Sequence, residues 1–327
     1  MRRLVLIALA LTLPALPFSA FRYFAAIDRT YPVAPETVVV PSGATGHDVA
    51  RLLETQGVIR SALVFDLLAR IRGDRTAMKA GEFAFAAHRT ESEILNQVVE
   101  GGQQVAVWVT IPEGFTAKEI AQTLAERNLG DVAALQSTFL DSSLKLDGSS
   151  TPNLEGYLFP DTYLVPTSAK PAEIATIMTD KFRAELPPDS AALAKHLGYS
   201  IPQIVTIASL VEREAKADDE RALMAGVYYN RLRLGMPLQV DATLEYTFAH
   251  HKDAITYADL ARDTPYNAYK HGGLPPTPIA NPGRASLYAA FHPQPSKYLY
   301  YVYMGNGHSA FSRTLSEHNA NVARYLH

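Results

Sequence analysis

Two glutamates follow directly after a strongly apolar stretch in the second half of the chain. From Ile201 the sequence reads IPQIVTIASLV, and Glu212, Arg213 and Glu214 follow directly. The apolar residues recur on nearly every side of the predicted helix, which is typical of a buried helix. A carboxyl group in such surroundings loses hydration, so its ionised form is disfavoured and its pKa rises. An acid with a raised pKa can donate a proton near neutral pH, and this helix end is therefore a candidate for general acid catalysis.

Helical phase alone does not choose between the two glutamates. Glu214 lies three residues after Val211 and shares its face, whereas Glu212 follows Ala208 on the other side of the helix. A glutamate at a helix end is also often only solvated or ion-paired, and Arg213 is one available partner. Periodicity therefore leaves both the choice of residue and its role open.

Four blocks of sequence occur along the chain in a specific order: ASLVEREA, YYNRLRLGMPLQVDATLEY, TPYNAY and GLPPTPIANPG. In this order they resemble the YceG-like family of endolytic murein transglycosylases, and the likeness runs from about Val38 to Arg324. The resemblance implies that the second glutamate of the V-E-x-E block, here Glu214, is the catalytic acid.

The resemblance also implies a reaction, the endolytic cleavage of peptidoglycan between N-acetylmuramic acid and N-acetylglucosamine, which would terminate nascent strands. Glu214 would protonate the glycosidic oxygen and then take the proton of the muramyl 6-hydroxyl, which closes a 1,6-anhydro ring. Such a lytic transglycosylase needs one carboxyl group, whereas a lysozyme-type muramidase that uses water needs a second. Two alternatives are kept: a muramidase, and a non-catalytic peptidoglycan-binding or scaffold protein.

Polar residues in the same blocks are predicted to bind the sugar. Asn230 and Arg231 match the family's N-R-L pattern. Gln239, Asp241 and Thr243 are predicted to lie on an extended stretch, where alternate side chains point the same way. That arrangement suits hydrogen bonds to acetamido and hydroxyl groups.

Two further segments contribute candidates for substrate binding. The stretch DTPYNAY places Tyr266 and Asn267 on a predicted loop, and a loop on a rigid scaffold is a usual place for substrate contacts. The aromatic-rich segment LEGYLFPDTYLVP resembles another block of the family. Glu155 is therefore a candidate binding residue, and Asp161 a candidate cleft or scaffold residue.

The elements that would position these residues follow from periodicity and capping. Residues 201–214 and 218–234 are predicted to form a central helix pair with a polar joint. Ser200 caps the first helix, and Gly235 ends the second in the left-handed conformation. Residues 298–312 are predicted to form a β-hairpin. Together with the strand VAVWVTI, these elements predict a mixed α+β catalytic domain over residues 103–327.

A smaller module is predicted over residues 36–102. The segments 37–40, 47–56, 63–71 and 79–85 give the order strand, helix, helix, strand. This βααβ order resembles a LysM-like module, a common binder of N-acetyl groups in glycans. The alternative is a spacer domain without a ligand.

The start of the chain is almost wholly apolar from Leu4 to Ala20, behind Arg2 and Arg3. This pattern indicates either a cleaved signal peptide or a membrane anchor. The resemblance favours an anchor over residues 1–26, with the arginines cytoplasmic by the positive-inside rule. We therefore expect a single-pass protein of the cell inner membrane with most of the chain in the periplasm.

Composition excludes several other functions. The 327 residues carry a formal net charge of -3 and no cysteine, so the sequence predicts neither a nucleic-acid partner nor a thiolate metal site. The ten histidines show no metal-ligand spacing, and we expect neither a metal nor another cofactor. The expected partners are peptidoglycan glycan strands, the membrane and, as the resemblance implies, penicillin-binding peptidoglycan synthases.

Overall fold

The computed structural model describes residues 37–41, 43–85, 89–102, 106–146, 148–248, 252 and 255–326. These residues form two compact units: one of residues up to Val107 with Pro166–Lys170, the other of Trp108–Val165 and the chain from Pro171 onward. The predicted anchor over residues 1–26 lies outside the described residues. Within the described ranges, no helix has the length and apolar character needed to cross a membrane.

The first unit has the predicted order of strand, helix, helix and strand. It consists of β1 (Thr37–Val40), α3 (Gly46–Thr55), α4 (Ala62–Arg72), β2 (Gly81–Ala84) and α5 (Glu91–Glu100). The strands pair antiparallel, from Thr37 opposite Ala84 to Val40 opposite Gly81. Alternate residues of β1 are buried, so one face of this ribbon closes a core that includes Phe65.

The second unit begins with a two-stranded sheet and three helices. These are β3 (Ala106–Thr110), α6 (Ala117–Glu126), α7 (Val132–Asp141), β6 (Thr162–Pro166) and α8 (Pro171–Glu185), and β3 pairs with β6. A short ribbon of β4 (Lys145–Leu146) and β5 (Ser149–Ser150) lies between α7 and β6 in the sequence. Thr116 and Glu119 form the capping box that starts α6.

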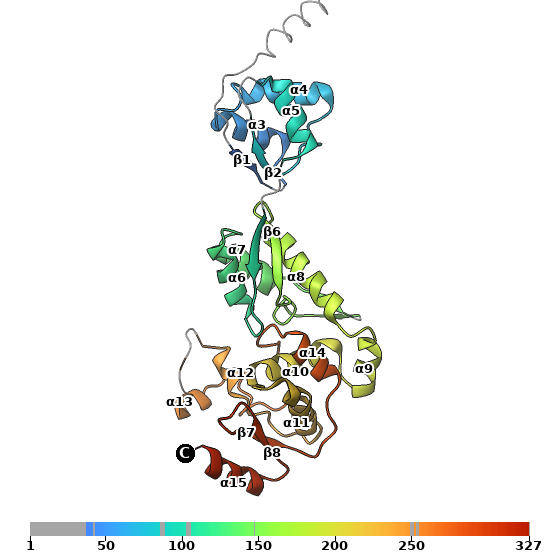
Figure 1. Cartoon of the computed structure of the whole chain (residues 1–327), viewed down its shortest axis with the longest axis vertical. Helices are drawn as coiled ribbons and strands as arrows, with labels where there is room; N and C mark the ends of the chain where they lie inside the picture. Colours follow the sequence, from blue (N-terminus) through green and yellow to red (C-terminus); the bar gives the residue numbers. More distant parts are fainter. Residues whose placement is uncertain are drawn as a thin grey trace, which may run out of the picture. The chain divides into compact units, whose positions relative to one another are not determined.

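The predicted central helix pair is confirmed. It consists of α10 (Ile201–Glu214) and α11 (Arg221–Arg233), joined through the short 3-10 helix η1 (Asp218–Glu220). Ser200 and Gln203 form a capping box at the start of α10, and every residue from Ile204 to Val211 is buried. Helix α14 (Arg284–Phe291) packs against both members of the pair, and α9 (Ser190–Leu197) packs against α10 and α14 (Figure 1).

The chain after α11 brings polar residues back toward the helix pair. Gly235 has φ 66°, as its predicted role as a left-handed stop requires. Next come α12 (Asp241–Glu245) and α13 (Tyr257–Leu260). The predicted hairpin forms from β7 (Tyr300–Tyr303) and β8 (Ser309–Ser312), which pair antiparallel, and α15 (Leu315–Tyr325) packs on both strands.

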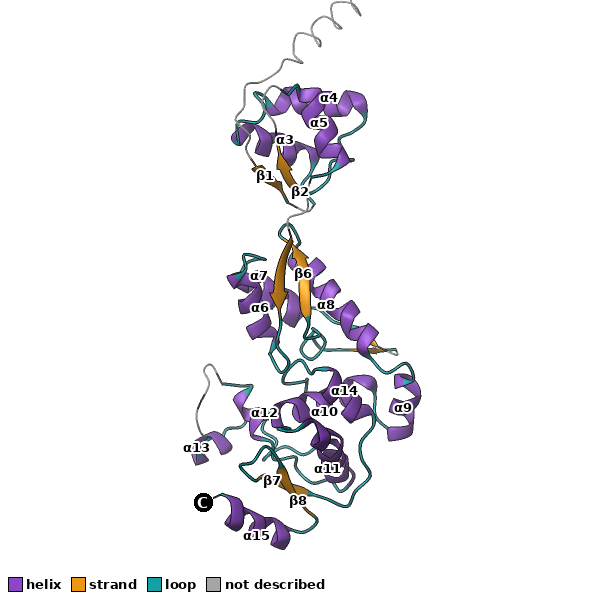
Figure 2. Cartoon of the chain, in the orientation of Figure 1, coloured by secondary structure: helices purple, strands orange, loops and turns teal. Residues whose placement is uncertain are grey.

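The fold class is mixed α+β, as predicted. Every sheet in the described part of the chain is a single pair of short strands, and helices hold far more residues of the second unit than strands do (Figure 2). One prediction is wrong: residues from Asp241 to Glu245 form a helix, not an extended stretch. The segment offers only a single turn of helical periodicity, which is too short to be distinguished from alternation.

Candidate active site

Glu214 is the last residue of α10, and its side chain is half-buried. The hydroxyl of Tyr301 on β7 donates a hydrogen bond to its Oε2 across 3.0 Å. Burial is the largest influence on this carboxyl group and raises its pKa, and the nearby charge of Asp241 raises it further. The Tyr301 hydrogen bond acts in the opposite direction because it stabilises the ionised form. The environment thus favours a protonated, donating acid.

Tyr301 belongs to a chain of hydroxyl groups that leads inward from Glu214. The hydroxyl groups of Tyr228 and Tyr301 lie 2.9 Å apart, and their rings meet edge to face with centroids 6.2 Å apart. Tyr228 on α11 is fully buried. A buried hydroxyl normally has a hydrogen-bond partner, and Tyr301 is that partner here.

A second carboxyl group lies on the solvent side of the site. Asp241, the first residue of α12, is exposed, and its Oδ1 accepts a hydrogen bond from the Tyr269 hydroxyl. The charges of Asp241 and Glu214 both raise the pKa of Tyr269, after the larger effect of burial. Glu214, Asp241 and Tyr269 therefore share one electrostatic environment.

Glu212 has a different position and different partners. Its Oε2 accepts the backbone N–H of Gly283 at 3.0 Å, and its Oε1 lies 3.4 Å from Nη1 of Arg221. Both oxygens are therefore used in contacts that join α10 to α11 and to the segment before α14. The two glutamates that helical phase left undecided therefore differ in their surroundings: Glu212 is held in an ion pair, and Glu214 is bound by Tyr301 within electrostatic range of the exposed Asp241.

Gln239 lies close to the same site. Its backbone is in the left-handed region with φ 53°, and its N–H donates to the carbonyl oxygen of Ala268 at 3.0 Å. The side chain is exposed, and its Oε1 accepts a hydrogen bond from Arg231 at 3.2 Å. Of the eight predicted binding residues, Gln239 and Asp241 are the two with exposed side chains.

Asn230 and Arg231 are buried, and the structure does not support direct substrate contact for them. Arg231 donates to the carbonyl oxygens of Leu299 at 2.6 Å and Leu238 at 2.7 Å, and its guanidinium lies over the ring of Tyr300. Asn230 donates from Nδ2 to the carbonyl oxygens of residues 296 and 298. Apart from the Arg231 contact with Gln239, both side chains donate to backbone carbonyl oxygens, so they hold the hairpin and the turn before α12 in place.

Thr243 and Asn267 are fully buried, and their side chains contact protein groups, so their contact with substrate stays a prediction. Thr243 donates to the carbonyl oxygen of Val240, since the helical turn of α12 points this residue inward. The amide of Asn267 donates to two carbonyl oxygens of its own loop and accepts the backbone N–H of Tyr269. Tyr266 is half-buried, and its hydroxyl lies 2.8 Å from that of Thr277. These contacts shape the loop that carries Tyr269.

Glu155 is also fully buried, and its carboxylate lies beside the first residue of α6. Its carboxylate accepts the N–H of Ala117, the amide of Asn281 at 3.0 Å and the hydroxyl of Tyr246 at 3.1 Å. Burial raises its pKa to about 7, against the opposing effect of these hydrogen bonds. Both carboxylate oxygens of Glu155 accept hydrogen bonds from protein groups, which is the arrangement of a scaffold residue, and its contact with substrate stays a prediction.

A muramidase would need a second carboxylate near Glu214, and the acidic residues that the sequence singled out for the cleft are Glu155, Asp161 and Asp241. Glu155 is enclosed as described, and Asp161 is bound to Lys181 at 3.0 Å. Asp241 is the one among the three whose charge acts on Glu214. The structure also places Glu245 near Glu214, although Arg213 neutralises it at 3.3 Å.

The residues that sequence reasoning missed are three tyrosines: Tyr228, Tyr269 and Tyr301. Tyr228 opens the YYNRL block, and Tyr269 closes the TPYNAY block. Tyr301 lies in an aromatic strand with no motif around it. Tyr228 and Tyr269 could have been found from their positions in the recognised blocks. Tyr301 could be found only from the tertiary structure.

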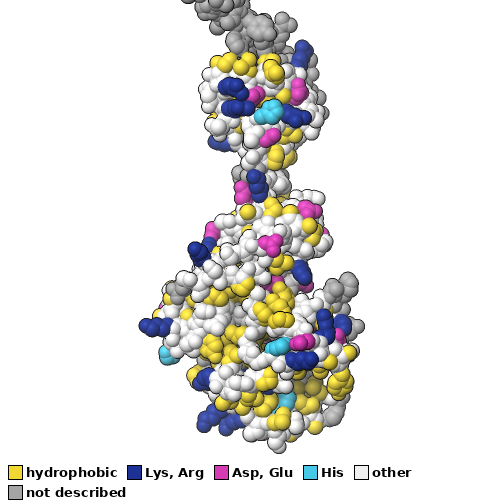
Figure 3. All heavy atoms as spheres, turned by 180° about the vertical axis from the view of Figure 1, so that it is seen from behind, with side chains coloured by type: hydrophobic (Ala, Val, Ile, Leu, Met, Phe, Trp, Pro, Cys, Tyr) yellow, Lys and Arg dark blue, Asp and Glu magenta, His cyan; other side chains and the backbone are white. Residues whose placement is uncertain are grey.

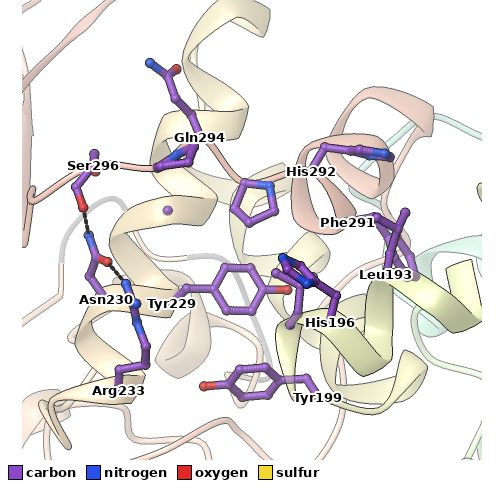
Figure 4. Close-up of a pocket in the computed structure, with 14 residues that line it drawn as sticks. Leu193, His196, Tyr199, Tyr229, Asn230, Arg233, Phe291, His292, Gln294 and Ser296 are labelled. Carbon is purple, nitrogen blue, oxygen red and sulfur yellow. Dashed lines mark hydrogen bonds between the residues drawn. The ribbon is translucent and has the colours of Figure 1, made fainter.

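A separate cavity of about 550 Å³ opens between α9, α11 and the segment after α14 (Figure 4). Tyr199 and Tyr229 line it with ring centroids 5.3 Å apart, beside His196 and His292. No Asp or Glu is among the lining residues, so this cavity lacks a carboxylic acid catalyst. It lies against a different face of α11 from Tyr228.

Metal-ion chemistry has no candidate site in the described part of the chain, where no three His, Cys, Asp or Glu side chains come together suitably. On the face that Figure 3 shows, Lys and Arg side chains lie at separate places among Asp and Glu side chains. This mixture agrees with the small formal net charge of -3.

Comparison with known proteins adds to this geometry. The model of the YceG-like family matches residues 38–324, which is most of the sequence. The chain belongs to the YceG-like family. Within this family, a relative from Bacillus subtilis named endolytic murein transglycosylase is 32% identical over 303 residues, or 88% of this chain and 84% of the relative.

A family member of the same name from Streptococcus pneumoniae serotype 2 is 30% identical and covers 89% of this chain. The chain spans only 58% of that longer relative. A crystal structure of a putative YceG-like protein from Listeria monocytogenes matches with a TM-score of 0.58 at 32% identity, covering 87% of this chain and 98% of that one. The family therefore accounts for both units of the described structure.

Proposed function

We propose that this chain is an endolytic peptidoglycan lytic transglycosylase in which Glu214 acts first as acid and then as base. The observation that carries the proposal is the Glu214 carboxyl group, half-buried at the end of an apolar helix, with a raised pKa and one oxygen held by Tyr301. The name endolytic murein transglycosylase, which the Bacillus subtilis relative bears, supports the choice of substrate.

The reaction needs one proton donor and no water. The Glu214 proton moves to the oxygen that links N-acetylmuramic acid to N-acetylglucosamine, and the bond from C1 to that oxygen breaks. The carboxylate then takes the proton of the muramyl 6-hydroxyl while O6 bonds to C1. The products are a 1,6-anhydro end and a free hydroxyl, and Glu214 is protonated again. Proximity within the substrate replaces an activated water molecule.

The test is the chemistry of the new strand ends. Purified full-length protein is incubated with peptidoglycan strands, and the products are separated and weighed by mass spectrometry. Transglycosylation leaves 1,6-anhydro ends, lighter by one water than hydrolysis products, whereas reducing ends as the main product would contradict the proposal. Absence of any cleavage by the folded protein would favour a peptidoglycan-binding scaffold.

A muramidase that uses water is the second candidate, because Asp241 is exposed and acts electrostatically on Glu214. A hydrolase needs such a second carboxylate to activate water or trap the sugar. The carboxylate of Asp241 is engaged by Tyr269, which favours a supporting role. The same product analysis separates the two reactions.

We also propose that residues 1–26 anchor the chain in the cell inner membrane, with the rest in the periplasm. The support is the apolar run from Leu4 to Ala20 behind two arginines. Mass spectrometry of the mature N-terminus tests this, since a chain that begins near Phe21 would indicate a cleaved signal peptide instead. Contact with penicillin-binding synthases is a further proposal that rests on the family resemblance.

The unit over residues 36–102 is proposed to bind glycan as a LysM-like module. Its support is the strand, helix, helix, strand order with an antiparallel strand pair. Sedimentation with insoluble peptidoglycan tests it by comparing the full chain with a chain that lacks this unit. Equal binding by the two would indicate a spacer.

A further inference from the structure

We propose that Tyr301, supported by Tyr228, is a positioning residue that directs the acidic proton of Glu214 to Oε1, away from Tyr301. The inference rests on the proposed function, because it assumes that Glu214 is the acid. It concerns the direction of hydrogen bonds in the chain Tyr228, Tyr301, Glu214, where the oxygen atoms are 2.9 and 3.0 Å apart.

When Glu214 is ionised, the hydrogen bonds of this chain can have only one direction. A carboxylate has no hydrogen to give, so the single hydroxyl hydrogen of Tyr301 must point to Oε2. Tyr301 then has only its lone pairs to offer Tyr228, and Tyr228 must donate to Tyr301. Every hydrogen in the chain therefore points toward Glu214.

The protonated state offers a choice between the two carboxyl oxygens. With the proton on Oε1, both tyrosine hydrogen bonds remain as they are. With the proton on Oε2, Glu214 donates to Tyr301, Tyr301 donates to Tyr228, and the hydrogen of Tyr228 loses its acceptor. Tyr228 is fully buried, and Tyr301 is its one hydrogen-bond partner within the described residues. A buried donor without a partner disfavours that state by about ten- to a hundredfold.

The consequence for catalysis is that one oxygen does both proton transfers. Oε1 of Glu214 accepts no hydrogen bond from the described part of the chain, and it carries the proton that the leaving oxygen receives. After transfer, Tyr301 still holds Oε2, so Oε1 is ready to accept the proton of the attacking hydroxyl without rotation of the carboxyl group. Preorganisation of this kind removes reorganisation from the reacting step.

The buried polar residues of α11 explain how Tyr301 is held. Arg231 donates to the carbonyl oxygen of Leu299 at 2.6 Å, two residues before Tyr301. Glu220, the last residue of η1 and directly before α11, accepts the N–H of Ser309 on β8 at 2.9 Å. These contacts fix the hairpin at both strands, and the Tyr301 hydroxyl is therefore placed by α11 rather than by the strand alone.

The test compares three hydroxyl deletions in the full-length chain, with kcat measured on peptidoglycan strands as a function of pH. Tyr301→Phe is expected to lower kcat about ten- to a hundredfold, because a hydrogen bond to a charged group is lost. The high-pH limb of the kcat profile should move upward, since ionised Glu214 loses its donor. Tyr228→Phe should lower kcat by a smaller factor, because only the bias toward Oε1 is lost.

Tyr303→Phe is the matched control. It removes a hydroxyl from the same strand, where that group accepts the N–H of Gly307 in the hairpin turn. Its kcat and pH profile should equal those of the wild type. A Tyr301→Phe variant with the same pH profile as this control, whatever its Tm, would overturn the inference and leave Tyr301 a structural residue.

Glu214→Gln separates this inference from the proposed function. A fully active Glu214→Gln protein would refute the acid itself, and the role of Tyr301 with it. An inactive Glu214→Gln protein beside a Tyr301→Phe protein of wild-type kcat and pH profile would refute the positioning role alone.

Discussion

Glu214 and Glu155 are both carboxyl groups of the second unit whose pKa values are raised by burial, Glu214 at the end of α10 and Glu155 beside the first residue of α6. Glu155 is fully enclosed and hydrogen-bonded on both oxygens, with a pKa of about 7. Glu214 is half-buried, and Tyr301 holds one of its oxygens. The comparison shows that a raised pKa does not identify a catalytic acid, because the acid must also present an oxygen to its substrate.

The largest expected effect is that of Glu214→Gln. The amide keeps the size of the side chain and can still accept from Tyr301, but it has no titratable proton. We expect kcat to fall by about a hundred- to ten-thousandfold, the usual contribution of general acid-base catalysis. Strand cleavage is measured by release of anhydro-ended fragments. A loss smaller than that caused by Glu155→Gln would reverse the comparison.

The second effect concerns stability at Glu155. Its pKa is about 7 in the folded chain against an ordinary 4.5, so folding takes up a proton between these values and stability falls as pH rises from 4.5 to 7. The fall amounts to at most about 3 kcal/mol. Glu155→Gln should remove this dependence of the free energy of unfolding on pH. It should change kcat little, because Gln can still accept from Ala117 and Asn281.

The measurement for Glu155 is urea unfolding of both proteins at a series of pH values. As pH rises to 7, the free energy of unfolding of the wild type should fall relative to that of the variant. Above pH 7 the two free energies should change with pH in the same way. An unchanged slope in Glu155→Gln would show that another group titrates.

Glu212 is the next test, since it flanks the same helix end. Glu212→Gln weakens the ion pair with Arg221 and should lower the free energy of unfolding by about 1–3 kcal/mol. Its kcat should remain far closer to that of the wild type than the kcat of Glu214→Gln. Activity is compared at a temperature where both variants are folded by circular dichroism. A greater loss of kcat in Glu212→Gln would move the acid to Glu212.

The smallest effect is expected for Asp241→Asn. Removal of this like charge lowers the pKa of Glu214, so the high-pH limb of kcat should move to lower pH by less than about one unit. The amide can still accept from Tyr269. A loss of kcat as large as that of Glu214→Gln would instead identify Asp241 as a second catalytic carboxylate and favour the muramidase.

Several elements of the second unit could be predicted from sequence because their signals are local. The capping box at Thr116, the Ser200 cap and the left-handed Gly235 each act within four residues of the chain. The central helix pair followed from the same short-range patterns. The one-turn helix α12 could not be predicted in this way. Because an extended stretch was predicted instead, Thr243 was expected to point toward the substrate, whereas the helix buries it.

The site itself depends on pairs that are distant in the sequence. Resemblance selected Glu214, but its donor Tyr301 lies 87 residues away, and the Asn281 partner of Glu155 lies 126 residues away. The N-R-L block was recognised, yet only the fold shows that Arg231 binds backbone carbonyl oxygens of the hairpin and the turn. Residue type determines what a side chain can donate or accept, whereas its partner depends on which distant segments the packed core brings within about 3 Å.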